Sequence, residues 1–131
     1  VLVVDAFSGD SIPVHLLTRE AVMLYLDRLK PGGVVALHVS NSHLDLRPVV
    51  GRIAAALNLQ AAYIADGGVE GDLGTSSSDW ILLSRDRRVL DLEPIRQAAQ
   101  PMPERAGARA WSDDYSNILQ VLSFGRADKN P

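Results

Sequence analysis

The sequence lacks cysteine, has few aromatic residues and contains no long apolar run. The absence of cysteine among 131 residues excludes disulfide bonds, thiolate metal sites and cysteine nucleophiles, and it leaves the redox compartment open. No stretch approaches the roughly 20 apolar residues of a membrane span. The net charge of −3 argues against nonspecific nucleic-acid binding, which needs a basic surface. With 47% hydrophobic and 22% charged residues, the composition is that of an ordinary soluble globular domain.

The chain also lacks an initiator methionine and any polar leader. It opens directly on the apolar run Val1–Val4. Because proteins rarely begin inside a core strand, we expect further chain to precede Val1. The length predicts one domain over residues 1–131, with residues 125–131 as a frayed tail.

Apolar periodicity predicts alternating strands and helices. Strands are expected at 1–5, 34–40, 60–65 and 80–84, and helices at 18–29, 45–57 and about 90–100, with a last helix or turn at 118–124. Thr18 and Asp45 are the expected N-caps, and Lys30-Pro-Gly-Gly ends the first helix. Strand-helix-strand spacing predicts an α/β fold with a mostly parallel sheet. The last two strands, which no helical pattern separates, are expected to form an antiparallel hairpin at the sheet edge.

Small polar and acidic residues follow the first strand. Asp5 ends it, and Ser8 and Asp10 lie in the loop beyond. Because ligands in open parallel sheets bind beyond the carboxyl ends of strands, these residues are candidates for contacting a cationic or hydroxylated ligand. The alternative is that Asp5 only terminates the strand or caps the next helix.

A second acidic group consists of Asp113, Asp114 and Tyr115. These residues could close a ligand pocket from the far side of the same edge, or an aspartate among them could cap a helix. Trp111 and Tyr115 could line a pocket, although packing is the commoner role of aromatic residues.

Histidines invite a metal hypothesis that their spacing does not support. His15, His38 and His43 do not follow a zinc motif, so we expect no metal site. His38 lies in an apolar strand, and we expect it to be a core residue with its polar atoms satisfied.

Several segments together resemble a known family. They are VVDAFSGDSIP at 3–13, LLTREA at 16–21, LKPGGV at 29–34, VSN at 39–41, DWILL at 79–83 and WSDDYSNIL at 111–119. These segments are similar to the second half of spermidine synthase-like proteins, including bacterial homologues in which the domain is fused to membrane segments. The resemblance implies a partial Rossmann-like, class I methyltransferase fold, a three-layer sandwich of which this chain would supply the carboxyl-terminal half. It also implies a cytoplasmic domain. Because the strand at 1–4 would lack its natural neighbour strand, its exposed backbone edge and apolar faces predict a homodimer or larger assembly.

The resemblance assigns roles to particular residues. Asp5 matches the first aspartate of the family's Asp-x-x-Asp-Pro motif, which implies that it is the catalytic base and contacts the amine. Asp5, Ala6 and Phe7 would contact decarboxylated S-adenosylmethionine or S-adenosylmethionine, and a small-molecule amine would meet Ser8, Asp10, Asp113, Asp114 and Tyr115. Ser8 replaces the second aspartate of the motif, and Ser11 stands where proline is expected after Asp10.

Three functions follow as hypotheses. The first is aminopropyl transfer from decarboxylated S-adenosylmethionine to a polyamine-type amine, with Asp5 as base. The second is methyl transfer from S-adenosylmethionine on the same fold. The third is a non-catalytic module that serves association. The glycine-rich loop and the acidic ribose contact of the family are absent, so the 131 residues alone are expected to be inactive and to need no metal.

Overall fold

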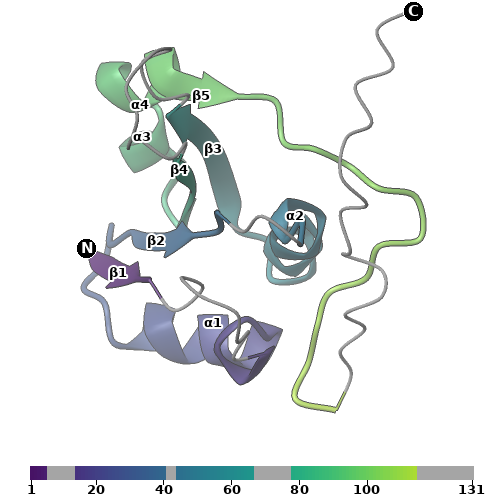
Figure 1. Ribbon diagram of the computed structural model, residues 1–131. Helices are drawn as coiled ribbons and strands as arrows, with labels where there is room; N and C mark the ends of the chain where they lie inside the picture. The colour runs from purple at the N-terminus through teal and green to yellow at the C-terminus, as the bar shows by residue number, and fades with distance from the viewer. Residues whose placement is uncertain (6–13, 41–43, 67–77, 115–131) are drawn as a thin grey trace, which may run out of the picture.

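The computed structural model describes residues 1–5, 14–40, 44–66 and 78–114. Its strands are β1 (Leu2–Val4), β2 (Val35–His38), β3 (Gln60–Asp66), β4 (Ser78–Ser84) and β5 (Ala99–Gln100), and its helices are the 3₁₀ helix η1 (Val14–Leu16), α1 (Arg19–Asp27), α2 (Arg47–Ala56), α3 (Arg87–Leu90) and α4 (Glu93–Ala98). Figure 1 shows α1 and α2 on one side of the strands, with α3 and α4 beside β5 at the far end of the sheet. The expected tail at 125–131 and the expected element at 118–124 lie outside the described residues.

The sheet is mixed, and the prediction of a mostly parallel Rossmann-like sheet is wrong. The strand order is β1-β2-β4-β3-β5, and only the β1–β2 pair is parallel. The pairs β2–β4, β3–β4 and β3–β5 are antiparallel. The physical reason is the position of β4. This strand runs antiparallel to β3 and lies between β2 and β3, so both of its neighbours are antiparallel. The expected hairpin is therefore not at the edge, because β4 is interior and β5 flanks β3.

These pairings bring several strand ends to one edge of the sheet. β2 and β3 both run opposite to β4, so β1, β2 and β3 share one direction. The carboxyl ends of these three strands and the start of β4 lie together where the strands end, and we call this side of the sheet the polar edge. α1 also begins on this side, next to the end of β1 (Figure 1). Asp5, His38 and Asp79 thus come from different strands to the same edge.

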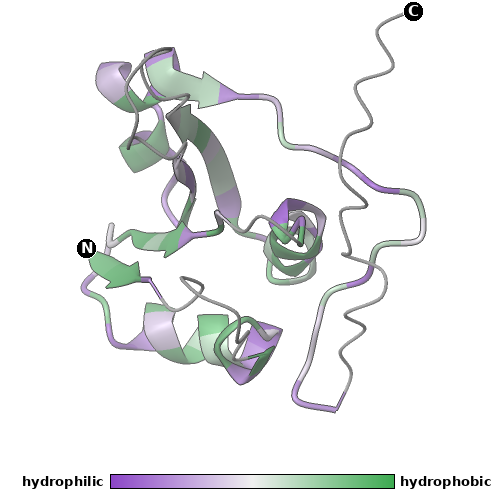
Figure 2. Ribbon diagram, in the orientation of Figure 1, coloured by the Kyte–Doolittle hydropathy of each residue, from purple (hydrophilic) through white to green (hydrophobic). Residues whose placement is uncertain are grey.

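The core lies between the sheet and the two longer helices. Its fully buried members include Leu37, Ile81 and Leu83 from the strands, Val22 from α1 and Ile53 from α2. Figure 2 shows the hydrophobic colouring of β1 and β2 at one end of the sheet. At that end Val3 remains 56% exposed, because side chains alternate along the strand and Val4, not Val3, lies on the face that packs against the core.

The predicted N-cap is correct for α1 and wrong by one residue for α2. Thr18 caps α1 as predicted, and its hydroxyl accepts a hydrogen bond from the Ala21 N–H. The cap of α2 is Leu46, which makes no side-chain capping bond, so the prediction of Asp45 is one residue too early. Asp45 still accepts a hydrogen bond from the Arg47 N–H, at 3.2 Å.

The chain after β5 crosses the molecule without regular secondary structure and returns to α1 (Figure 1). Trp111 anchors this segment, because its side chain is completely buried in the core. Its carbonyl accepts a hydrogen bond from the Arg19 N–H at 2.8 Å. Trp111 therefore has the packing role rather than that of a pocket wall.

Candidate functional site

The polar edge carries a hydrogen-bonded pair of ionisable side chains. Asp5 follows β1 and His38 ends β2, and the Asp5 Oδ1 atom lies 2.7 Å from the His38 Nδ1 atom. The parallel register of β1 and β2 pairs Val4 with Leu37, so Asp5 and His38 follow as the next neighbours. The side chain of Asp5 is 52% exposed and that of His38 is 18% exposed. A solvent-accessible carboxylate is thus held by a largely buried imidazole.

Trp80 completes this cluster from the neighbouring strand. It lies directly opposite His38 in the β2–β4 register, and the two rings stack with centroids 4.6 Å apart and planes inclined by 22°. The stacking fixes the plane of the imidazole, since a rotation of His38 would lose the ring contact. We call Asp5, His38 and Trp80 the Asp5 cluster.

A second polar group lies at the same edge, and we call it the Arg47 cluster. Arg47 donates from Nε and Nη2 to the two carboxylate oxygens of Asp45 at 2.8 and 3.0 Å, and from Nη1 to the Tyr63 hydroxyl at 2.9 Å. The Tyr63 hydroxyl in turn donates to Asp79 Oδ1 at 3.1 Å. The Asp79 N–H donates to the Ser40 Oγ atom, which ties β4 to the end of β2.

The Arg47 cluster has perturbed protonation. The hydrogen bond to the Asp45 carboxylate raises the pKa of Arg47, and the Tyr63 hydroxyl adds to this effect. Burial acts in the opposite direction but does not outweigh them. Burial acts to raise the pKa of Asp45, but hydrogen bonds and charge from Arg47 outweigh it and leave that pKa below its usual value. Burial is also the main reason that the pKa of Tyr63 is raised. These shifts describe a satisfied structural network, with every member bonded to another.

The two clusters face opposite sides of the sheet. Asp79 and Trp80 are consecutive in β4, so their side chains alternate. Tyr63 belongs to the core on the side of α1 and α2, whereas His38 and Trp80 share the other face. The Arg47 cluster therefore fixes the edge from the helix side, and the exposed carboxylate belongs to the Asp5 cluster alone.

The second predicted acidic group is only partly described. Asp113 Oδ1 accepts a hydrogen bond from the Thr18 hydroxyl at 2.8 Å, and the Asp113 N–H donates to Glu20 at 3.1 Å. Asp113 therefore clamps the start of α1. Asp114 is exposed. The structure does not bring either aspartate into contact with Asp5.

The other predicted contacts fall outside the described residues. These are Ala6, Phe7, Ser8, Asp10 and Tyr115. Among residues 1–5, 14–40, 44–66 and 78–114, no group of three or more metal-ligating side chains of the His, Cys, Asp and Glu type is found.

Sequence reasoning missed the partner of Asp5. It placed His38 in the core with its polar atoms satisfied, but Nδ1 meets Asp5 and Nε2 is buried without a hydrogen-bond partner in the described structure. The available signal was positional: adjacent parallel strands ended in aspartate and in histidine, which places both side chains at one edge. Trp80 gave no such signal, because it becomes the cross-strand neighbour of His38 only when β4 lies antiparallel beside β2.

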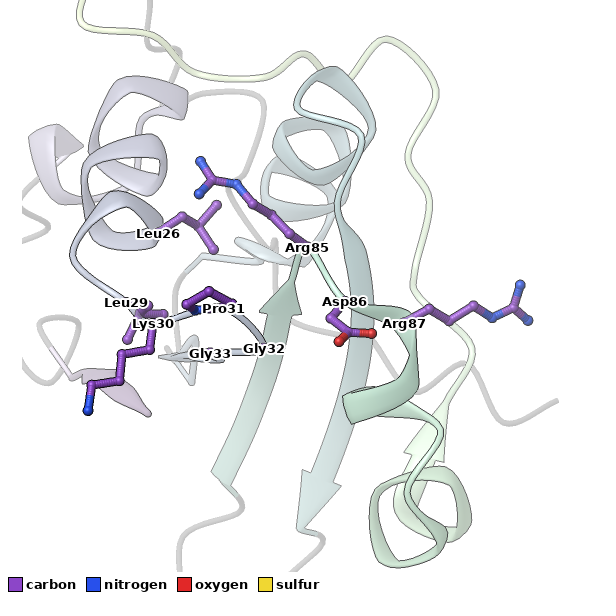
Figure 3. A pocket seen from close by; sticks show the side chains of 9 residues that line it. All are labelled: Leu26, Leu29, Lys30, Pro31, Gly32, Gly33, Arg85, Asp86 and Arg87. Carbon is purple, nitrogen blue, oxygen red and sulfur yellow. The ribbon is translucent and has the colours of Figure 1, made fainter.

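A cavity of about 480 Å³ lies at the opposite edge of the sheet. Lys30, Arg85 and Arg87 line it around an apolar floor that includes Leu26 and Leu29. Figure 3 shows Lys30 and Arg87 pointing away from the hollow. Arg85 is already paired with Asp27 at 2.9 Å, and Arg87 lies 3.5 Å from Asp91. Cations that diverge and are already paired do not form a convergent anion site, so this cavity is set apart from the candidate site.

Comparison with protein-family models finds no match, and comparisons with curated proteins and with solved structures find no significant similarity. No described helix combines the length and apolarity that a membrane crossing requires. The Asp5 cluster is therefore interpreted from its own chemistry and from the sequence resemblance.

Proposed function

We propose that this chain belongs to a transferase that moves a carbon group from a nucleoside sulfonium donor to an amine, with Asp5 as the proton acceptor. The observation that carries the proposal is the Asp5 carboxylate, half exposed at the end of β1 and hydrogen-bonded to His38. The resemblance to spermidine synthase-like proteins assigns the base to this same residue. Aminopropyl transfer is the favoured reaction, and methyl transfer is its alternative.

The chemistry requires a carboxylate of this kind. An amine attacks only in its neutral form, so a base must take the proton of the ammonium. Its nitrogen then forms a bond to the carbon attached to sulfur, and the carbon–sulfur bond breaks with its electron pair passing to sulfur. The products are a secondary ammonium and a neutral thioether, and the carboxylate holds the proton that it took from the ammonium before the attack. A half-exposed Asp5 is accessible to the amine and is anchored at one oxygen.

The sulfonium donor carries a positive charge, which is complementary to the Asp5 carboxylate. The negative charge of Asp5 favours a nearby sulfonium or ammonium group, and its exposure leaves that group room to approach. Ala6 and Phe7, the other residues that the resemblance assigns to the donor, lie outside the described residues. Asp5 is thus the described residue on which the proposal is tested.

The test is calorimetric titration and product analysis with the full-length protein. The ligands are decarboxylated S-adenosylmethionine, S-adenosylmethionine and methylthioadenosine, and the acceptors are diamines. We expect the decarboxylated donor to bind best and to yield an aminopropylated amine. Asp5→Asn should lower kcat roughly 100-fold or more, because general-base catalysis contributes about 10²–10⁴.

Asp27→Asn is the matched control, because Asp27 is an exposed aspartate whose ion pair with Arg85 lies at the opposite edge of the sheet. It should leave turnover unchanged. Preference for S-adenosylmethionine with methyl transfer would replace the aminopropyl assignment. No binding of any donor would refute both reactions. Association through the exposed strand β1, measured by sedimentation of the chain, would then be the supported alternative.

A further inference from the structure

The imidazole of His38 is held on two sides. Its Nδ1 atom lies 2.7 Å from the Asp5 carboxylate, and its ring stacks on Trp80. Strand pairing positions both contacts, since Asp5 directly follows β1 and Trp80 is the register partner of His38 in β4. The ring therefore has a defined plane and a defined direction toward one oxygen of Asp5.

The contact also selects one tautomer of the neutral ring. An ionised carboxylate only accepts hydrogen bonds, so the proton of the ring lies on Nδ1. The Nε2 atom is buried and has no hydrogen-bond partner in the described structure, so nothing there stabilises a proton on Nε2. The contact between Nδ1 and Asp5 thus decides in favour of the form that donates to the carboxylate.

We propose that His38 is a positioning residue for Asp5 and that Trp80 braces it. The inference rests on the proposed function, because it concerns how Asp5 serves as proton acceptor. The Nδ1–H group engages Oδ1, and Oδ2 has no partner among the described residues. His38 therefore orients the carboxylate so that Oδ2 faces the amine. Reaction rates are sensitive to such alignment, and a displacement of about 1 Å can cost about 100-fold.

Two substitutions of similar size separate the hydrogen bond from simple packing. His38→Asn keeps an N–H donor close to the position of Nδ1, whereas His38→Leu removes it. We expect kcat to fall roughly 10- to 100-fold in H38L while KM for the donor stays close to wild type. H38N should recover most of the lost turnover. Equal kcat in H38L and H38N would overturn the proposal, whether both are active or both impaired.

Trp80 gives a second, independent comparison. Trp80→Phe keeps an aromatic face for the imidazole, and Trp80→Leu does not. We expect W80L to lower kcat more than W80F, with both variants still folded by circular dichroism. Equal turnover in W80L and W80F would refute the bracing role.

A spectroscopic measurement keeps the inference testable apart from catalysis. In ¹⁵N-histidine-labelled protein, His38 should show a protonated Nδ1 and an unprotonated Nε2. Asp5→Ala should abolish that preference. If wild type shows this tautomer but transfers nothing to an amine, the proposed function fails and the Asp5–His38 arrangement stands. If His38 carries its proton on Nε2, the positioning role fails even where transfer is observed.

Discussion

Thr18 joins two parts of the chain that lie far apart in sequence, and its removal gives a sharp test of the fold. Its side chain is completely buried. The hydroxyl accepts a hydrogen bond from the Ala21 N–H at 3.1 Å and donates one to Asp113 Oδ1 at 2.8 Å. Thr18→Val keeps the shape of the side chain and removes both bonds.

The expected cost has two parts. Loss of an N-cap destabilises a helix by about 1 kcal/mol. Losing the hydrogen bond that the buried Thr18 hydroxyl donates to the Asp113 carboxylate costs about 1–2 kcal/mol more, because hydrogen bonds to charged groups are stronger than neutral ones. The free energy of unfolding should therefore fall by about 2–3 kcal/mol, which lowers Tm by roughly 10 °C in a domain of this size. Urea unfolding followed by tryptophan fluorescence measures it, because Trp111 is buried in the core beside this contact.

A double-mutant cycle isolates the bond between Thr18 and Asp113. Asp113→Ala alone removes the acceptor, and the double variant should cost about 1 kcal/mol less than the sum of the single variants. Asp114→Ala is the matched control and should change stability by less than about 0.5 kcal/mol. Additive effects, or a Thr18→Val variant as stable as wild type, would refute the clamp between α1 and residues 111–114.

Two further predictions concern the glycines and the response to acid. Gly33→Ala should lower the free energy of unfolding by about 1–3 kcal/mol, because the added Cβ would lie 2.6 Å from Leu29 Cβ. Gly51→Ala in α2 should raise it by about 0.5–1 kcal/mol, because the added Cβ meets only a flexible side chain, at 3.4 Å. Urea midpoints that move in the same direction for both would contradict this packing. The pKa of Asp45 is lowered by Arg47 despite burial, so its contribution to stability is complete above its unfolded pKa and is lost as pH falls below about 4. Asp45→Asn should remove that part of the acid dependence in unfolding measured at successive pH values, and an unchanged profile would contradict it.

The helix α1 was predictable because its determinants are local. Thr18 supplies the cap, Val22 and Leu26 the buried face, and Lys30-Pro-Gly-Gly the end. The cap of α2 was predicted one residue early, because Asp45 bonds the Arg47 N–H from outside the helix. Local chemistry thus identified the contact correctly but not the boundary.

The sheet could not be predicted in the same way. Apolar runs located β2, β3 and β4, but strand pairing is not encoded in the run itself. The position of β4 depends on which gap it fills during packing, and its insertion between β2 and β3 made most pairings antiparallel. The mostly parallel prediction failed at this step.

The candidate site was also predictable only in part. The sequence by itself determined that a carboxylate, Asp5, ends an apolar strand, since composition and local pattern suffice for that. Only the tertiary structure decided that His38 contacts this carboxylate across 33 positions and that Trp80 stacks behind it. The physical reason is that register between strands arises from the packing of the whole sheet, whereas a strand and its terminal residue arise from neighbours along the chain.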